Sequence, residues 1–108
     1  MTAFQSDHEL TVGRGVIAEL VEMAALEVPG VLRVGRGGSV LRRAIGGPAV
    51  SIRFDDDRVR VRMWIVARPG HAIRGLTTQV GAAVAATVER LLGLELAEVT
   101  VLVDGVGS

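Results

Sequence analysis

In the middle of the chain, at the start of the segment 58–67, apolar and non-apolar residues alternate from Arg58 to Arg62. A period of two residues is typical of a strand that lies half buried in a sheet. The apolar positions, which should face the core, are Val59, Val61, Met63 and Ile65. The positions on the other side are Arg58, Arg60, Arg62 and Trp64. We therefore expect this strand to be the centre of the fold.

A second alternating segment, residues 49–54, comes just before the central strand. Asp55-Asp56-Asp57 separates the two segments, and consecutive aspartates favour a turn. The pattern predicts a β-hairpin. In this hairpin Arg53 should share the polar face of the central strand.

Two segments have the period of an amphipathic helix. The first covers about residues 16–27 and should end at Pro29-Gly30, because proline cannot continue a helix and glycine accepts a left-handed turn. Its apolar centre is formed by Ile17, Val21, Ala24 and Val28. The second helix covers about residues 71–92 and should end at Gly93. Its apolar stripe is formed by Ile73, Leu76, Val80, Val84, Val88 and Leu91.

The remaining segments complete a small α+β domain. Short strands are expected at residues 9–12 and 31–34, and a final strand at residues 97–104. The prediction is one domain over residues 9–106, with an antiparallel or mixed sheet of about four or five strands and two helices packed on one face. Residues 1–8 should be a flexible N-terminus, the Gly-rich residues 35–48 a mobile basic loop, and residues 107–108 a tail.

Composition narrows the class of protein. The 108 residues carry no formal net charge, which argues against a general nucleic-acid binder. The absence of cysteine excludes disulfides and Cys-based metal sites, and it fits a reducing cytoplasm. The N-terminus lacks the pattern of a signal peptide, and no apolar run is long enough to span a bilayer. We therefore expect a cytoplasmic protein.

Three patterns that resemble functional motifs have simpler structural explanations. Gly13-x-Gly15-x-x-Ala18 matches a dinucleotide-binding fingerprint, but the segment before it is short and polar and no acidic residue follows at the ribose position. Consecutive residues of one turn, such as the three aspartates at 55–57, cannot converge on one metal ion. His8 and His71 lack a Cys, Ser or paired carboxylate at a spacing that suggests catalysis. We expect no catalytic residue, no metal, no cofactor and no small-molecule substrate.

The polar face of the predicted hairpin is a stronger candidate for a binding surface than these three motifs. It combines Arg53, Arg58, Arg60, Arg62 and Trp64. Cations and an aromatic on strands can bind phosphates and stack a base, and anionic lipid headgroups or an acidic partner are equally suitable ligands. One aromatic is a poor platform, however, and Glu95 or Glu98 could pair with the arginines if their strand is a neighbour. Nucleic acid is therefore an unfavoured partner.

The outer face of the second helix is small and almost uncharged, which is unusual for a solvated helix. It includes Gly75, Thr78, Ala82, Ala85 and Ala86. Side chains of this size let another backbone approach closely. Either a partner protein or the loop at residues 35–48 should cover this face.

Three segments, in this order, carry a family resemblance. The first is residues 15–31, which end in Ala-Ala-Leu-Glu-Val-Pro-Gly-Val. The second is residues 59–66 running into Pro69-Gly70-His-Ala-Ile73 and Gln79-Val80, and the third is residues 88–94 followed by 99–103. Together they resemble the alkaline shock protein family, also called envelope stress response proteins of Gram-positive bacteria, over about residues 9–106.

The resemblance implies a small α+β domain without catalytic activity, in a cytoplasmic protein linked to envelope stress. It also implies that some members self-associate and that some are attached to the membrane through a separate anchor protein. Our function hypothesis is therefore a non-enzymatic interaction protein that self-associates and docks to a membrane-anchored partner. The alternative is a nucleic-acid or anionic-surface binding module that uses the arginine-rich face.

Overall fold

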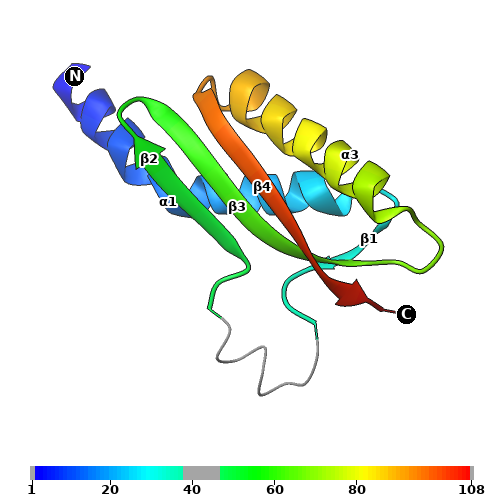
Figure 1. The fold of residues 1–108 in the computed structure, drawn as a ribbon. Coiled ribbons are helices and arrows are strands. Elements are labelled where there is room, and N and C mark those ends of the chain that lie inside the picture. Colours follow the sequence, from blue (N-terminus) through cyan, green and yellow to red (C-terminus); the bar gives the residue numbers. More distant parts are fainter. Residues whose placement is uncertain (1, 38–46, 108) are drawn as a thin grey trace.

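The computed structural model describes residues 2–37 and 47–107, with side chains from Gly13 onward. The chain forms a four-stranded sheet with two helices on one of its faces (Figure 1). The strands are β1 (Val31–Val34), β2 (Val50–Asp55), β3 (Arg58–Ala67) and β4 (Glu95–Val106). The predicted α+β class, with two helices and a small sheet, is confirmed.

Strand β3 is the centre of this sheet, as its alternation predicts. Its first six residues pair antiparallel with β2, and its last three pair antiparallel with β1, so that these two strands share one edge of β3. Strand β4 runs parallel to β3 along the whole of the other edge. The sheet is therefore mixed. The side chains of Val59, Val61, Met63 and Ile65 are buried, as expected, and are at most 2% exposed.

The β2–β3 connection is the predicted hairpin. Asp55 pairs with Arg58, so only Asp56 and Asp57 form the turn. Asp56 has a positive φ of 59°. Aspartate tolerates this left-handed conformation better than most residues, which explains its use at this position.

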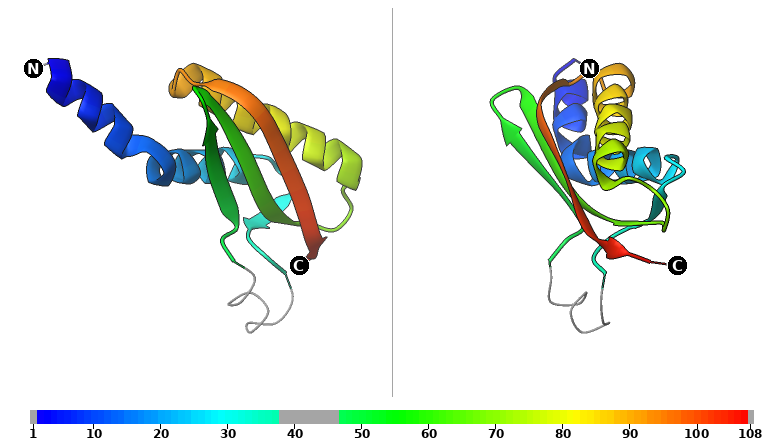
Figure 2. Two further views of the ribbon diagram at one scale, coloured as in Figure 1. Left: turned by 60° about the vertical axis from the view of Figure 1, so that its left-hand side comes forward. Right: turned by 45° about the vertical axis from the view of Figure 1, so that its right-hand side comes forward.

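Helix α1 (Thr2–Leu26) differs from the prediction at its start. The backbone of residues 9–12 is helical, so the short strand predicted there is wrong. The helix kinks at Gly13, whose φ and ψ are not helical, and its first half extends beyond the sheet (Figure 2). The second half buries Ile17, Val21 and Ala25 against the sheet. The flexibility of residues 1–8 and the bounds of the domain stay predictions.

Helix α3 (Ile73–Ala86) continues into a π-helical turn, η1 (Thr87–Leu91). Leu76, Val80, Val84 and Val88 are buried, so the centre of the predicted stripe is correct. The prediction is wrong at both ends, since Ile73 is 42% and Leu91 is 72% exposed. A π turn holds one residue more than an α turn. The π turn therefore rotates Leu91 away from the core, and the next residue, Leu92, packs against the core instead.

The turn after α1 joins three parts of the fold. The carbonyl of Gly30 accepts a hydrogen bond from the amide of Arg68, at the end of β3. A Cβ at Gly30 would lie 2.7 Å from Leu76 Cδ1 and 2.9 Å from His71 Nδ1. The Val28-Pro29-Gly30 segment therefore needs glycine because α3 begins directly against it. Gly93, with a φ of 66°, ends the second helix as predicted.

The helices and the sheet form two layers around one core. Seen from the side, α1 and α3 lie on the same face of the sheet, and the other face has no helix on it (Figure 2). Among the described residues, no helix is both long and apolar enough to cross a bilayer. The arrangement leaves two surfaces for partners, which are the bare sheet face and the outer side of α3.

Candidate interaction surfaces

We call the sheet face that is turned away from α1 and α3 the open face; the viewer looks onto it in Figure 1. The register places its side chains in rows across β2, β3 and β4. Asp55, Arg58 and Glu95 form one row. Arg53, Arg60 and Glu98 form the next. Ser51, Arg62 and Thr100 form the third. All four predicted arginines therefore lie on one surface.

Two of these arginines are neutralised by carboxylates. Arg58 Nε lies 3.1 Å from Glu95 Oε1, across the β3–β4 pair. Arg60 contacts both neighbours, with Nη1 2.9 Å from Glu98 Oε1 and Nε 3.1 Å from Asp55 Oδ2. The pairing of Glu95 and Glu98 with the arginines, which the sequence offered as an alternative use of this face, is confirmed. These pairs are half exposed, so each adds at most about 1 kcal/mol to stability.

Arg62 and Arg53 are different. In the part of the chain whose side chains are described, neither guanidinium has an ion-pair partner. Both line a hollow of about 310 Å³ on the open face. Its other lining residues are Ser51, Arg60, Val61, Glu98 and Thr100. The free positive charge of the open face is concentrated at this hollow.

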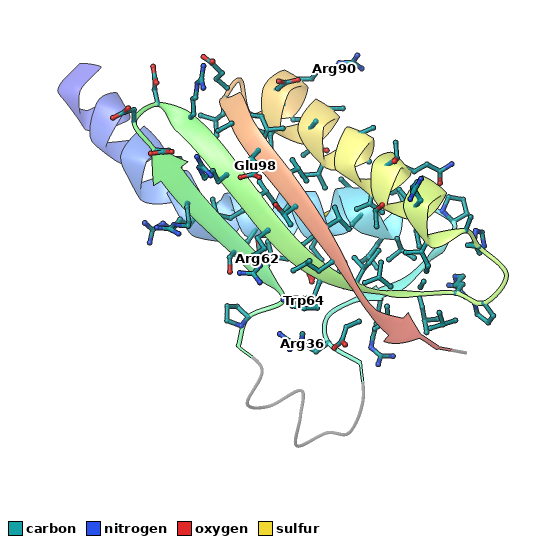
Figure 3. All side chains as sticks on the ribbon, viewed as in Figure 1. Arg36, Arg62, Trp64, Arg90 and Glu98 are labelled. Carbon is teal, nitrogen blue, oxygen red and sulfur yellow. The ribbon has the colours of Figure 1, made fainter. Side chains whose placement is uncertain are left out.

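Trp64 lies on the same face, but it is already in contact with another cation. The guanidinium carbon of Arg36 lies 4.0 Å from the centroid of its ring. Nε of Arg36 also lies 3.3 Å from Asp104 Oδ2, and the amide of Gly37 donates to the same oxygen at 2.9 Å. In Figure 3, Glu98, Arg62, Trp64 and Arg36 follow one another along this face. Arg36 thus occupies a ring face that a nucleic-acid base would need.

The outer side of α3 has the small residues that the sequence predicts. Gly75, Thr78 and Ala82 are exposed, whereas Ala85 and Ala86 are half buried. The hydroxyl of Thr78 donates to the carbonyl of Arg74 within the helix, so it needs no outside partner. Residues 38–46 of the loop that could cover this surface lie outside the described residues. Which molecule covers it stays a prediction.

Strand β4 forms an edge of the sheet beside α3. This twelve-residue strand pairs with β3 on one side, and no described strand pairs with its other side. The middle of β4 reads Val99-Thr-Val-Leu-Val103, which is apolar apart from one threonine. A long edge strand of this kind exposes unpaired backbone N–H and C=O groups. Helix α3 packs beside β4, so the free edge of this strand and α3 are neighbours (Figure 1).

Comparison with known proteins shows which family this arrangement represents. The family model of alkaline shock protein 23, described as having a cell envelope-related function, matches residues 3–108. The chain belongs to this family. It is the alkaline shock protein family, so the resemblance found in the sequence is confirmed. No curated protein matches the chain.

Solved structures similar to this alkaline shock family chain show the same fold. One is a manganese form of the MamM CTD, with 19% identity, a TM-score of 0.60 and coverage of 83% of this chain and 95% of that one. A zinc form has 18% identity, a TM-score of 0.60 and coverage of 83% and 82%. A nickel form has 18% identity, a TM-score of 0.62 and coverage of 85% and 98%. At these identities the likeness concerns the fold alone.

The structure shows where the three weaker sequence motifs of this alkaline shock family chain lie. Gly13 and Gly15 lie inside α1 at its kink, not between a strand and a helix as a dinucleotide site requires. The aspartates at 55–57 lie at the hairpin turn, and His71 lies against Gly30. The side chain of His8 is outside the described part. Among the described side chains, no group of three or more His, Asp or Glu could hold a metal ion.

Sequence reasoning missed two residues of the open face. Arg36 was assigned to a loop, and Thr100 to a strand of unknown position. Trp64 indicates that a cation could stack on its ring, but the sequence does not show which of the many arginines would do so. Only the parallel β3–β4 register brings Thr100 beside Arg62.

Proposed function

We propose that this chain is a non-enzymatic interaction module that self-associates at the cell envelope and docks to a membrane-anchored partner. The observation that carries the proposal is the free edge of β4 next to α3, a helix whose outer side is almost uncharged. The family's envelope-related description supports the place of action. Under this proposal the chain resides in the cytoplasm and reaches the membrane only through its partner.

A non-enzymatic role is supported by the polar contacts. Among the described side chains, the hydrogen bonds between two side chains all join an arginine to a carboxylate. A catalytic site needs a nucleophile or base within hydrogen-bond reach of the group that activates it. Arginine–carboxylate pairs on a sheet are structural contacts and supply no such group.

A second copy of β4 is the partner that best fits the edge of the first. Two β4 strands can pair antiparallel about a two-fold axis and join two sheets into one. Thr100 and Leu102 lie on the open face, and Val99, Val101 and Val103 on the helix face. A register centred on Thr100 keeps these faces together and sets Glu98 opposite Leu102. A register centred on Val101 would instead oppose Glu98 to Asp104, and like charges opposite each other are unfavourable.

The same axis would bring α3 of one copy toward α3 of the other. The exposed Ala82 and the half-buried Ala85 and Ala86 would then permit close approach of the two helices. This contact explains why an otherwise solvated helix face carries almost no charge. Self-association would thus use both the free edge of β4 and the small residues of α3.

Light scattering over a range of concentrations tests the self-association. The expected result is a mass of two or more chains that falls toward one chain for Ala82→Glu. Met23→Glu is the matched control, since Met23 is 60% exposed on α1 and the change is also from an uncharged residue to glutamate. A wild-type mass of one chain at high concentration would overturn the proposal. Loss of assembly with Met23→Glu alone would move the contact to α1.

Hydrogen exchange separates edge pairing from a contact between helices alone. Amides of residues 99–103 that face away from β3 should exchange more slowly as the concentration rises, because they gain hydrogen bonds to the second copy. The amides of β2 are the internal reference and should not change. Assembly without added protection in β4 would contradict the edge pairing.

Docking to a membrane-anchored partner needs its own test. Crosslinking in the native cell, followed by capture of the tagged chain in detergent, should recover a protein that has a transmembrane segment. A variant that cannot self-associate, such as Ala82→Glu, shows whether docking requires assembly. Recovery of the tagged chain with soluble proteins only would contradict the docking half of the proposal.

A further inference from the structure

The hollow on the open face gathers hydrogen-bond donors that the protein itself does not use. Arg53 and Arg62 have no ion-pair partner among the described residues, and the hydroxyls of Ser51 and Thr100 have no hydrogen-bond partner there. All four residues line the same space of about 310 Å³. The position of Arg62 is marked in Figure 3. Two guanidinium groups and two hydroxyls therefore line one open hollow.

The register explains how these groups converge. Arg62 lies between Ser51 on β2 and Thr100 on β4, directly opposite each. Arg53 is one row away, on the diagonal from Arg62. Diagonal neighbours across two strands are about 7–8 Å apart, within reach of long side chains. One ligand in the hollow can thus contact both guanidinium groups and a hydroxyl.

Arg60, between them, has a different role. Its guanidinium is held by Asp55 and Glu98. Arg60 lies between Arg53 on β2 and Glu98 on β4. Arg62 lies two residues further along β3, on the same face. The positive charge available to a ligand is therefore that of Arg53 and Arg62.

We propose that this hollow binds a single phosphate group. Guanidinium forks match the oxygens of phosphate in pairs, and the hydroxyls of Ser51 and Thr100 can donate to its remaining oxygens. A carboxylate has only two oxygens and would leave part of this donor set unused. A tetrahedral oxyanion uses the arrangement more completely.

The surroundings of the hollow restrict what carries the phosphate. Carboxylates lie around the hollow on the same face or at its turn, at Asp55, Asp56, Glu95, Glu98 and Asp104. A nucleic-acid strand would bring its neighbouring phosphates against these charges. An isolated phosphate, free or on a small molecule or a lipid headgroup in a mostly neutral membrane, meets the two free arginines, and Glu98 is the one carboxylate among the described residues that lines the hollow. This inference does not rest on the self-association proposed above, although Glu98 and Thr100 belong to β4, the strand that would pair with a second copy.

Glu98 should set the affinity of the site. Its carboxylate lines the hollow and is held by Arg60. It repels an anion in the hollow, and its pairing with Arg60 reduces that repulsion without removing it. Removal of this charge should therefore strengthen phosphate binding, which is the opposite of the effect expected from loss of either free arginine.

The test is a titration of the isotope-labelled full chain with inorganic phosphate at constant ionic strength, in which NMR spectra are recorded at each phosphate concentration. Shifts should be confined to the Arg Nε–H signals of Arg53 and Arg62 and to the amides beside Ser51 and Thr100. Arg62→Gln and Arg53→Gln should each weaken binding by about tenfold or more, since each loses a charge-assisted contact. Glu98→Gln should bind several-fold more tightly.

Arg58→Gln is the matched control. It removes the same charge from the same face, but Arg58 lies outside the hollow and is paired with Glu95. Its affinity for phosphate should stay within about twofold of the wild type, because Arg58 does not line the hollow and solvent partly screens its exposed charge. An equal loss for Arg58→Gln would show a diffuse surface charge and overturn the proposal. Equal shifts with chloride, or none with phosphate, would also overturn it.

A second arm distinguishes the sources of the phosphate. Vesicles of phosphatidylcholine with a small fraction of phosphatidic acid present the group on a membrane. Sedimentation of the wild type with these vesicles, lost in Arg62→Gln and kept in Arg58→Gln, assigns the site to a lipid headgroup. Binding of free phosphate without sedimentation assigns it to a soluble ligand. If neither form binds, the proposal is wrong.

Discussion

Arg36 lies over the ring of Trp64, with its guanidinium carbon 4.0 Å from the ring centroid, and its Nε contacts Asp104 at 3.3 Å. These contacts join three segments that are distant in the sequence. The side chains of Arg36 and Asp104 are only 21% and 12% exposed, so solvent screens them less than the other ion pairs of the open face. Arg36 and Gly37, which follow β1, are thereby held against the end of the sheet.

Trp64 reports directly on this contact, because it is the chain's single tryptophan. Arg36→Gln removes the cation that lies over the Trp64 ring, and it also removes the ion pair between Arg36 and Asp104. We expect a change in the intensity and the emission maximum of tryptophan fluorescence. We also expect a loss of about 1–2 kcal/mol in the free energy of unfolding, from the cation–π and ion-pair contributions together. Urea denaturation followed by circular dichroism measures the second effect.

Arg14→Gln is the control for this substitution, since Arg14 is exposed on α1 and distant from Trp64 in the sheet. It should change neither the emission spectrum nor, beyond about 0.5 kcal/mol, the stability. An unchanged spectrum in Arg36→Gln would mean that the stacked arrangement is not populated in solution.

Gly30 makes the close approach of α1, β3 and α3 possible. A Cβ added there would lie 2.7 Å from Leu76 Cδ1, and Leu76 is buried and cannot move freely. Gly30→Ala should therefore lower the free energy of unfolding by about 1–3 kcal/mol, through overpacking. Thermal or urea unfolding checks the value.

Gly75→Ala is the matched comparison, because a Cβ at Gly75 would meet no atom within 4 Å. An alanine in an exposed helical position should leave the stability unchanged or raise it by up to about 1 kcal/mol. Similar losses in the two variants would contradict the contact with Leu76 as the cause of the loss at Gly30.

The π turn at the end of α3 makes two adjacent leucines unequal. Leu91 is 72% exposed, whereas Leu92 is half buried and packs against the core. Leu91→Ala should change the free energy of unfolding by less than about 0.5 kcal/mol. Leu92→Ala should cost about 1–3 kcal/mol, less than a fully buried leucine. A larger loss for Leu91 would mean that the helix continues as a regular α-helix.

This pair of leucines shows how far a periodic pattern can predict packing. A strict helical period correctly identifies Leu76, Val80, Val84 and Val88 as core residues. It fails at Leu91 because one extra residue in the last turn changes the phase of everything after it. Local alternation in β3 predicted the correct faces because a strand without a bulge of its own keeps its phase.

The binding surfaces were predictable only in part. Alternation alone places Arg53, Arg60 and Arg62 on one face. It does not show which of them are free, because that depends on Glu98, on a strand that is parallel to β3 and 38 residues away from Arg60. Parallel pairing has no turn that fixes its register from the sequence. For this reason the hollow between Arg53 and Arg62 could not be derived before the structure was known.

The pair of Arg58 and Glu95 tests the parallel register itself. Their side chains are 58% and 61% exposed, and Nε lies 3.1 Å from Oε1. A double-mutant cycle with Arg58→Gln and Glu95→Gln should give a coupling energy of about 0.2–1 kcal/mol at low salt. Because the Debye length falls to about 3 Å at 1 M salt, the coupling should then nearly vanish. Urea unfolding at both salt concentrations supplies the four free energies.

The reference cycle pairs Arg53 with Glu95, which lie on the same face but in different rows and on strands that are not neighbours. Its coupling should be close to zero at both salt concentrations, since no contact joins the two side chains. A shift of β4 by two residues along β3 would keep every face unchanged but would move Glu95 away from Arg58. A zero coupling for Arg58 and Glu95, with normal folding of all variants, would therefore contradict the register and, with it, the place of Thr100 and Glu98 beside the hollow.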